Sequence, residues 1–115
     1  MAAAHYKLDH LFCFIDCNNQ QADGPPAKIM AVEPVHEKWT AFGWDTQRLN
    51  GNDIAAITGA LEAAKQVPGR PHAIVLDTLM GKGVPLFEQR EKNHFIRVDA
   101  EEWEIARTQL EETEA

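Results

Sequence analysis

A turn that follows an apolar run carries the residues of this chain best suited to binding a metal ion. The run extends from Leu11 to Ile15, and the turn reads Asp16-Cys17-Asn18-Asn19-Gln20-Gln21-Ala22-Asp23-Gly24. A buried strand at the run places Asp16 and Asn18 at the carboxyl edge of a sheet, where open α/β sheets bind ligands. Magnesium and calcium take carboxylate, amide and backbone oxygens, and magnesium often keeps phosphate oxygens as further ligands. The turn therefore predicts a metal and diphosphate site.

The segments that precede residue 44 alternate between helical and extended patterns. Residues 1–8 favour the end of a helix, and the continuous apolar run 11–15 is typical of a strand buried on both faces. Asp23-Gly24-Pro25-Pro26 is a turn signal. A connection leads from this turn to a helix that begins at Glu33-Pro34 and ends near Gly43, because proline suits a first turn and glycine a C-terminal stop.

The rest of the chain continues this alternation. Residues 44–49 favour a second strand, and Asp53 caps the helix that follows an Asn-Gly turn. The apolar positions of that helix are Ile54, Ile57, Leu61 and Ala64. Residues 73–76 favour a third buried strand, residues 81–98 a loop, and residues 99–112 a last helix with a capping-box pattern. Strands that alternate with helices predict an α/β fold with three layers, in which helices cover both faces of a mostly parallel sheet.

Composition and charge exclude several classes of partner. The chain has 115 residues, a net charge of −7 and 44% hydrophobic residues, which is ordinary for one small globular domain. No basic stripe exists to neutralise the phosphates of a nucleic acid or of an anionic membrane surface. No apolar run approaches the roughly 20 residues of a membrane span. Cys13 and Cys17 form no zinc pattern, and we expect both to be reduced thiols of a cytoplasmic protein.

Several motifs, in one order along nearly the whole chain, resemble the thiamine-diphosphate-binding domain of transketolases. They are His5-Tyr6-Lys7-Leu8-Asp9-His10-Leu11, Ile15-Asp16-x-Asn18, Gln21-x-Asp23-Gly24, Trp39-x-Ala41-Phe42-Gly43-Trp44, Asn50-Gly51-x-Asp53, Thr78-x-Met80-Gly81-Lys82-Gly83-Val84 and His94. The pattern is most similar to the amino-terminal subunit of split, two-gene transketolases. It resembles only the second half of that domain, so the resemblance implies a single partial thiamine-diphosphate-binding domain over residues 1–115.

The resemblance implies a role for five residues. Asn18 matches the asparagine whose side-chain oxygen binds the divalent metal, Mg²⁺ or Ca²⁺, and Gln20 matches a position that supplies a backbone carbonyl to the same ion. Ala22 and Met80 match positions beside the thiazolium ring of thiamine diphosphate. His94 matches a catalytic-site histidine near the diphosphate and the substrate. Because the Gln20 ligand is a backbone atom, we expect its side chain to matter little.

Two of these residues, and two other parts of the chain, also have a purely structural interpretation. Asn18 is of a type that often caps a turn through its own side chain. An isolated histidine such as His94 commonly lies on the surface. The glycines of Gly81-Lys82-Gly83 lack the spacing of a nucleotide-binding loop, and we expect them to let the backbone approach the cofactor closely. The aromatic residues of the segment 39–44 favour packing in a core or an interface.

The half of the family's motif that this chain does not carry limits what it is expected to do. The family's Gly-Asp-Gly, with its metal-binding aspartate, lies upstream of the matched region, as do histidines that hold diphosphate and substrate. Met1 aligns with a position inside a helix of the family, so we expect it to stand at an internal methionine. The glutamate that activates the cofactor belongs to another domain. We therefore expect the isolated chain to be inactive.

The resemblance implies an activity and partners for the parent protein. The activity is a transferase reaction that moves a two-carbon ketol unit between sugar phosphates, and the partner is a complementary C-terminal transketolase subunit in an oligomer. Two alternatives remain open. The chain is a non-catalytic interaction module that needs a complementary chain, or it is part of another thiamine-diphosphate enzyme of the deoxyxylulose-phosphate synthase or ketoacid dehydrogenase type.

Overall fold

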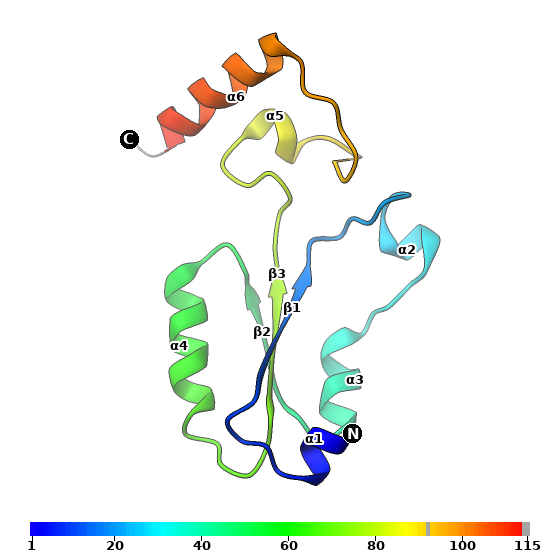
Figure 1. Ribbon diagram of the computed structural model, residues 1–115, viewed down its shortest axis with the longest axis vertical. Coiled ribbons are helices and arrows are strands. Elements are labelled where there is room, and N and C mark those ends of the chain that lie inside the picture. Colours follow the sequence, from blue (N-terminus) through cyan, green and yellow to red (C-terminus); the bar gives the residue numbers. More distant parts are fainter. Residues whose placement is uncertain (92, 114–115) are drawn as a thin grey trace. The chain divides into compact units, whose positions relative to one another are not determined.

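Helices alternate with parallel strands along residues 1–91 and 93–113, which the computed structural model describes (Figure 1). The strands are β1 (Phe12–Cys17), β2 (Asp45–Asn50) and β3 (His72–Asp77). The helices are α1 (Ala2–His5), α2 (Pro26–Ile29), α3 (Val35–Ala41), α4 (Ile54–Ala64), α5 (Pro85–Glu88) and α6 (Ala100–Thr113). The three strands and their alternation with helices confirm the predicted α/β class.

The chain divides into two compact units. The first, unit 1, consists of Met1–Cys17 and Val32–Thr78 and contains the three strands with α1, α3 and α4. The second, unit 2, consists of Asn18–Ala31 and Leu79–Ala115 and contains α2, α5 and α6. The sheet therefore belongs to one unit, and the segments that continue from the ends of β1 and β3 belong to the other.

Strand β3 lies at the centre of the sheet. The strand order is β1-β3-β2, and both neighbours pair with β3 in parallel, with Phe12 and Asp45 each in register with His72. Residues 71–75 are buried without interruption, and Ile74 and Val75 have no exposed surface. A strand with a parallel neighbour on each edge and a helix over each face is apolar along its length, which explains the run Ala73-Ile74-Val75-Leu76.

Helices α3 and α4 cover opposite faces of this sheet (Figure 1). The chain passes from β1 to β2 through α3 and returns to β3 through α4, so two right-handed crossovers in opposite directions place the helices on opposite faces. On one face, the Gln47 amide donates to the Ala60 carbonyl of α4 at 3.0 Å. On the other, Arg48 binds Glu33, just before α3. The predicted three layers are confirmed.

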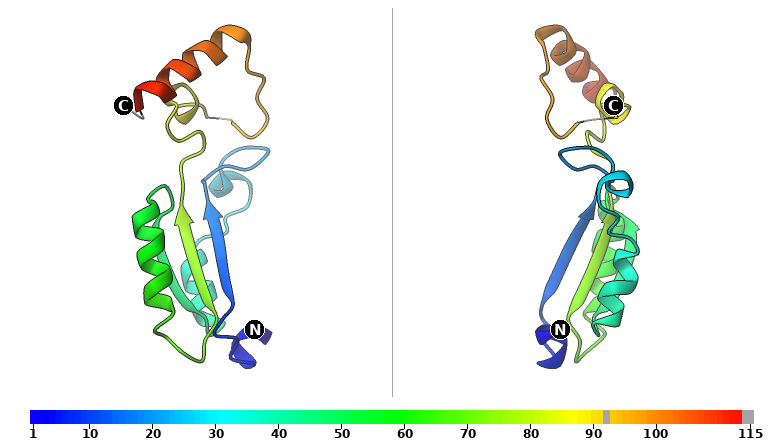
Figure 2. Two further views of the ribbon diagram at one scale, coloured as in Figure 1. Left: turned by 60° about the vertical axis from the view of Figure 1, so that its left-hand side comes forward. Right: turned by 90° about the vertical axis from the view of Figure 1, so that its right-hand side faces the viewer.

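The expectation that the first strand is buried on both faces is wrong. Strand β1 is an edge strand, with β3 as its neighbour in the described sheet (Figure 2). Phe14, at the middle of β1, is 49% exposed. Phe14 is in register with Ile74, so it points to the face of α4, but α4 packs on β2 at the other edge. Ile54, expected on the apolar side of α4, is 75% exposed, and Ala60 and Ala64 are the buried residues of that helix.

A buried histidine at the start of β3 connects the start of β2 to the segment that precedes β1. His72 is 1% exposed and stacks on Phe12 with ring centroids 4.8 Å apart. Its Nδ1 lies 3.0 Å from Asp45 Oδ2, and its Nε2 lies 3.1 Å from the Asp9 carbonyl oxygen. Asp9 Oδ2 also accepts the Gly69 N–H at 3.0 Å. Every polar atom of the ring therefore has a partner, as a buried polar group requires.

Unit 2 contains two short helices that the sequence analysis placed in connections. Each begins at a proline, α2 at Pro26 and α5 at Pro85, a position where proline is well suited to the first turn. They are single turns, too short for a hydrophobic periodicity to reveal them. The expected loop over residues 81–98 is therefore wrong for Pro85–Glu88.

The last helix forms as predicted. The Asp99 side chain accepts the Glu102 N–H at 2.9 Å, and the Glu102 side chain accepts the Asp99 N–H at 3.2 Å, which is a capping box with aspartate in the first position. Phe87 of α5 meets Trp103 edge to face with ring centroids 6.2 Å apart, and the Leu86 N–H donates to Gln109 at 3.0 Å. These contacts pack α5 against α6.

Candidate functional site

The turn that follows β1 is closed by its own hydrogen bonds. Asn18 Oδ1 accepts the Gln20 N–H at 3.0 Å, and Asn19 between them has a φ of 55°. The backbone groups of Gln21 and Gly24 exchange two hydrogen bonds of 3.1 Å, and Gly24 has a φ of 137°. The left-handed conformations at Asn19 and Gly24 suit asparagine and glycine and explain why these residue types occur here.

The structural interpretation of Asn18 is therefore correct: its side chain caps the turn. This contact leaves room for a second one, because a carbonyl oxygen has two lone pairs and the Gln20 N–H engages one of them. The expected metal role of Asn18 and of the Gln20 carbonyl stays a prediction. The hydrogen bond from the Gln20 N–H orients the Asn18 side chain within the turn.

The side chain of Gln20 makes contacts that the sequence analysis missed. Its Nε2 donates to the Arg90 carbonyl at 3.3 Å, and its Oε1 accepts the Asn93 N–H at 3.0 Å. The expectation that this side chain matters little rests on the backbone ligand alone and does not anticipate these two hydrogen bonds. Glutamine carries both a donor and an acceptor, and that residue type is the one signal in the sequence for such a contact.

The five predicted site residues all belong to unit 2. Asn18, Gln20 and Ala22 lie in one turn, Met80 lies just before Gly81, and His94 directly follows Asn93. The turn and the segment before His94 are joined through Gln20. His94 itself is exposed, and its ring meets that of Phe95 edge to face at 4.9 Å. Ala22 is exposed and Met80 is half-buried.

The glycine-rich segment after β3 has structural reasons for its glycines. Gly81 has a φ of 74°, and a Cβ there would lie 2.7 Å from the Cβ of Phe87. Glu88 accepts the Gly83 N–H at 2.9 Å, which holds the pKa of its carboxyl below its usual value, and Lys82 Nζ lies 3.4 Å from Glu88. Close packing on α5 accounts for Gly81, while approach of this backbone to a cofactor stays a prediction.

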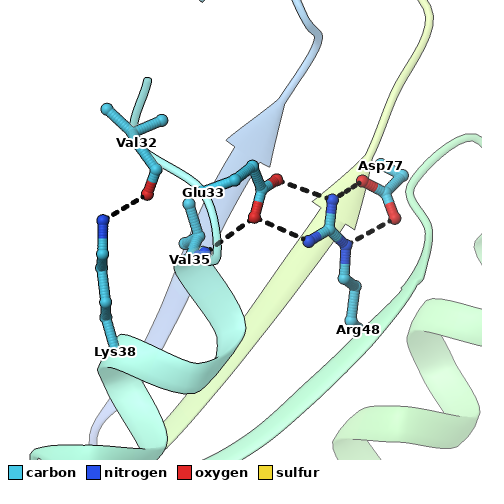
Figure 3. A network of polar contacts seen from close by, with 6 residues as sticks. All are labelled: Val32, Glu33, Val35, Lys38, Arg48 and Asp77. Carbon is cyan, nitrogen blue, oxygen red and sulfur yellow. Dashed lines mark hydrogen bonds and ion pairs between the residues drawn. The ribbon is translucent and has the colours of Figure 1, made fainter. Parts of the chain in front are cut away.

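An arginine at the carboxyl end of the sheet holds two carboxylates (Figure 3). Arg48 donates to Glu33 at 2.9 and 3.0 Å and to Asp77 at 2.7 and 2.9 Å. The hydrogen bonds to Asp77 and Glu33 raise the pKa of Arg48, and those from Arg48 and the Val35 N–H lower the pKa of Glu33. Burial raises the pKa of the nearby Cys17 thiol, and Glu33 raises it further.

The oxygen atoms available at this turn are of the kind that binds a hard cation, but they are few. The side-chain oxygen of Asn18 and the backbone carbonyl of Gln20 are the oxygen ligands that Mg²⁺ and Ca²⁺ prefer. Mg²⁺ takes six such ligands, so water, phosphate or another chain must complete the set. Within the described residues, no group of three or more His, Cys, Asp or Glu side chains is placed to hold a metal.

An open apolar pocket lies elsewhere, in unit 1. It has a volume of about 460 Å³ and is lined by Met1, Lys38, Trp39, Phe42 and Trp44. Trp39 and Trp44 meet edge to face at 4.6 Å, and Trp44 is buried while 52% of Phe42 is exposed. The aromatic residues of this segment thus combine core packing with an exposed surface. None of the five predicted site residues lines the pocket.

Residues 1–113 match the family described as transketolase, thiamine diphosphate binding domain, and the chain belongs to this family. It is 48% identical over 104 residues to a transketolase family protein of Sinorhizobium fredii, across 90% of this chain and 37% of that protein. It is 39% identical over 111 residues to the 6-deoxy-6-sulfo-D-fructose transketolase subunit SqwG of Clostridium sp., across 96% of this chain and 40% of that subunit.

Solved transketolases share the fold. The transketolase of Pichia stipitis, in complex with sedoheptulose-7-phosphate, superposes with a TM-score of 0.67 and 30% identity, across 73% of this chain and 13% of that one. The chain spans about two fifths of the length of these two curated relatives. The predicted family and the partial thiamine-diphosphate-binding fold are therefore confirmed. Both cysteines are free thiols, and no helix in the described ranges is long and apolar enough to cross a bilayer.

Proposed function

We propose that this chain supplies the closing half of a thiamine-diphosphate and metal site in a transketolase-like transferase. The Asn18 side-chain oxygen and the Gln20 backbone carbonyl bind a divalent metal, Mg²⁺ or Ca²⁺. Ala22 and Met80 pack beside the thiazolium ring, and His94 donates a hydrogen bond to the diphosphate or to a substrate phosphate. The proposal concerns residues 1–115 as one partial thiamine-diphosphate-binding domain of a cytoplasmic parent protein.

The chemistry divides between the cofactor and these residues. Thiamine diphosphate, when bound, supplies the carbanion chemistry of two-carbon ketol transfer between sugar phosphates. The residues of this chain bind and orient the cofactor. The oxygens of Asn18 and Gln20 would hold the metal ion, whose charge offsets that of the diphosphate. The apolar side chains of Ala22 and Met80 would exclude water from the thiazolium ring. His94 contributes a positioned donor. The chain anchors the cofactor rather than carrying the proton transfers.

One observation carries the proposal. In the turn after β1 the Asn18 side-chain oxygen accepts the Gln20 N–H, and the same turn is joined through the Gln20 side chain to Asn93, which precedes His94. Membership of the transketolase thiamine-diphosphate-binding family supplies the ligand that this arrangement suits. The two metal-site residues and the histidine thus come from segments 73 residues apart in sequence that the fold brings into contact.

The parent protein needs further chain segments. A relative named as a transketolase subunit supports a two-chain enzyme, in which a C-terminal transketolase subunit completes the active site of an oligomer acting on a sugar phosphate. The isolated chain lacks the ligands that the family's other segments supply, so it is inactive. Its own affinity for thiamine diphosphate with Mg²⁺ is weaker than about 10 μM, which corresponds to roughly −7 kcal/mol.

Two measurements test this proposal. In ¹⁵N NMR spectra of the full chain, millimolar thiamine diphosphate with MgCl₂ should shift resonances of residues 18–22, Met80 and His94. In Asn18→Ala the Mg²⁺-dependent part of these shifts should disappear, while Asn52→Ala, an asparagine in the turn after β2, should leave them intact. Absence of shifts at these positions in the wild type contradicts the cofactor role. Calorimetric binding tighter than about 10 μM contradicts the incompleteness of the site.

A second candidate is a non-catalytic interaction module, and the edge strand favours it. Phe14 is 49% exposed at the centre of β1, on a sheet edge that is open in the described structure. Such an edge offers a row of backbone groups for pairing with another strand. Because the matched region covers 37% and 40% of two relatives, the occupant we infer is a complementary chain with the remainder of a transketolase domain. Sedimentation with such a chain should yield a complex; a mixture that stays two monomers contradicts this candidate.

A further inference from the structure

The side chain of Gln20 connects two segments of unit 2 that are distant in sequence. Its Nε2 donates to the Arg90 carbonyl, 70 residues away, at 3.3 Å. Its Oε1 accepts the N–H of Asn93, 73 residues away, at 3.0 Å. The backbone N–H of the same residue donates to Asn18 Oδ1 at 3.0 Å. One residue therefore contacts both the turn that carries the proposed metal ligands and the backbone next to His94.

The segment that receives the Gln20 side chain is anchored from its other side. Asn93 is 8% exposed, and its Nδ2 donates to the carbonyl of Phe87 in α5. Arg90 forms an ion pair with Glu102 of α6, and its guanidinium lies 5.4 Å from the centre of the Phe87 ring. Residues 90 and 93 thus each contact both Gln20 and the helices α5 or α6. His94 directly follows Asn93 in the sequence.

We propose that Gln20 is a positioning residue whose side-chain amide sets the distance between the metal-binding turn and His94. This inference rests on the proposed function, because it takes Asn18, the Gln20 carbonyl and His94 to serve one site. It adds that the backbone and the side chain of Gln20 have different roles. The backbone carbonyl would bind the ion, and the side chain holds the backbone of Asn93, which precedes the histidine.

The contacts require an amide at this position. Leucine has a similar size but neither donor nor acceptor, so Gln20→Leu loses both hydrogen bonds. Glutamate keeps an acceptor for the Asn93 N–H but has no donor for the Arg90 carbonyl, so Gln20→Glu keeps the contact nearest to His94. Gln21→Leu is the matched control, because the neighbouring glutamine contributes its backbone to the turn through Gly24.

The first experiment measures the link without a cofactor. Amide hydrogen exchange of the full chain, followed by NMR, should show the Asn93 N–H exchanging at least about ten-fold faster in Gln20→Leu than in the wild type. The order parameter of the His94 amide should fall from about 0.85 towards 0.6. Gln20→Glu should keep most of the protection, and Gln21→Leu should match the wild type. Unchanged exchange and order in Gln20→Leu overturn the inference, as does an equal effect in Gln21→Leu.

The second experiment separates this inference from the proposed function. Mn²⁺ added with thiamine diphosphate broadens amide signals according to their distance from the ion. In the wild type, we expect broadening at both Asn18 and His94. In Gln20→Leu, the broadening at His94 relative to Asn18 should fall several-fold, and Gln20→Glu should restore it. An unchanged ratio in Gln20→Leu overturns the positioning role. Absence of broadening at both residues in the wild type overturns the proposed metal site, and the exchange and order data then decide the role of Gln20.

Discussion

Arg48 of β2 binds the carboxylate of Asp77 at the end of β3 through two parallel hydrogen bonds, from Nε at 2.9 Å and from a terminal nitrogen at 2.7 Å. This fork-to-fork geometry is the strongest form of an arginine–carboxylate pair. The same guanidinium reaches Glu33, so one side chain ties the carboxyl ends of two strands to the segment that begins α3. It joins neighbours that are 15 and 29 residues away in the sequence.

Loss of this arginine should destabilise unit 1 measurably. Arg48→Ala removes both carboxylate pairs and leaves Glu33 and Asp77 facing each other, and we expect a loss of about 1 kcal/mol in the free energy of unfolding. Arg107→Ala is the matched control, since Arg107 pairs with Glu104 and Glu111 on the exposed surface of α6 alone. The control should cost less than Arg48→Ala does, because solvent screens the exposed pairs of Arg107. Equal effects in urea denaturation would contradict a special role for Arg48.

The contribution of Glu33 should depend on pH in one direction. Its pKa lies below the ordinary value of 4.5, because Arg48 and then the Val35 N–H stabilise the carboxylate. A carboxyl whose pKa is lower in the folded chain contributes stability above the unfolded pKa and loses it as the pH falls through the folded pKa. The stability difference between the wild type and Glu33→Gln should thus be full at pH 6 and shrink below about pH 4.5. A difference that grows on acidification would refute this assignment.

Gly51 should tolerate no side chain. A Cβ at this position would lie 2.5 Å from Thr78 Cγ2 and 2.7 Å from Leu76 Cβ, because the turn after β2 packs directly on β3. We expect Gly51→Ala to cost about 1–3 kcal/mol through overpacking. Gly59→Ala is the opposite case: Gly59 lies within α4 with nothing within 4 Å of its added Cβ, so alanine should stabilise by about 0.5–1 kcal/mol. Thermal unfolding of both variants checks the two signs together.

Cys17 should react slowly with alkylating reagents. Burial raises the pKa of its thiol, and the Glu33 and Asp77 carboxylates raise it too, while Arg48 opposes them. Since the thiolate is the nucleophile, a Cys13→Ala chain should be alkylated by iodoacetamide more slowly than free cysteine at pH 8. Adding Glu33→Gln should speed the reaction a few-fold, and Glu101→Gln on α6 should not change it. A rate that falls in the Glu33 variant would contradict this electrostatic account.

Features that depend on neighbouring residues in the sequence were predictable. Asp53 accepts the Ala56 N–H as the expected cap of α4, and Asp99 with Glu102 forms the expected capping box. Gly43, with a φ of 86°, follows the end of α3 as expected. The two capping contacts span three residues, and the glycine directly follows its helix, so residue types and spacing contain the information they need.

Features that depend on contacts between distant segments could not be predicted in the same way. The apolar run at β1 indicated a strand buried on both faces, yet Phe14 is half exposed because the strand order places β3, not β1, at the centre. Burial follows from the order of strands, and a run of apolar letters does not specify that order. The short helices α2 and α5 were not predicted for a different reason: a single turn has too few residues to show a hydrophobic period.

The sequence by itself determined the family, the α/β class and the identity of the candidate ligands, because these depend on residue types in a fixed order. The tertiary structure alone decided which residues from distant segments come into contact. It linked Gln20 to the backbone before His94 and joined Arg48 to Asp77. Hydrogen bonds require atoms within about 3 Å of each other. Only the folded chain brings residues that are 29 to 73 positions apart to that distance.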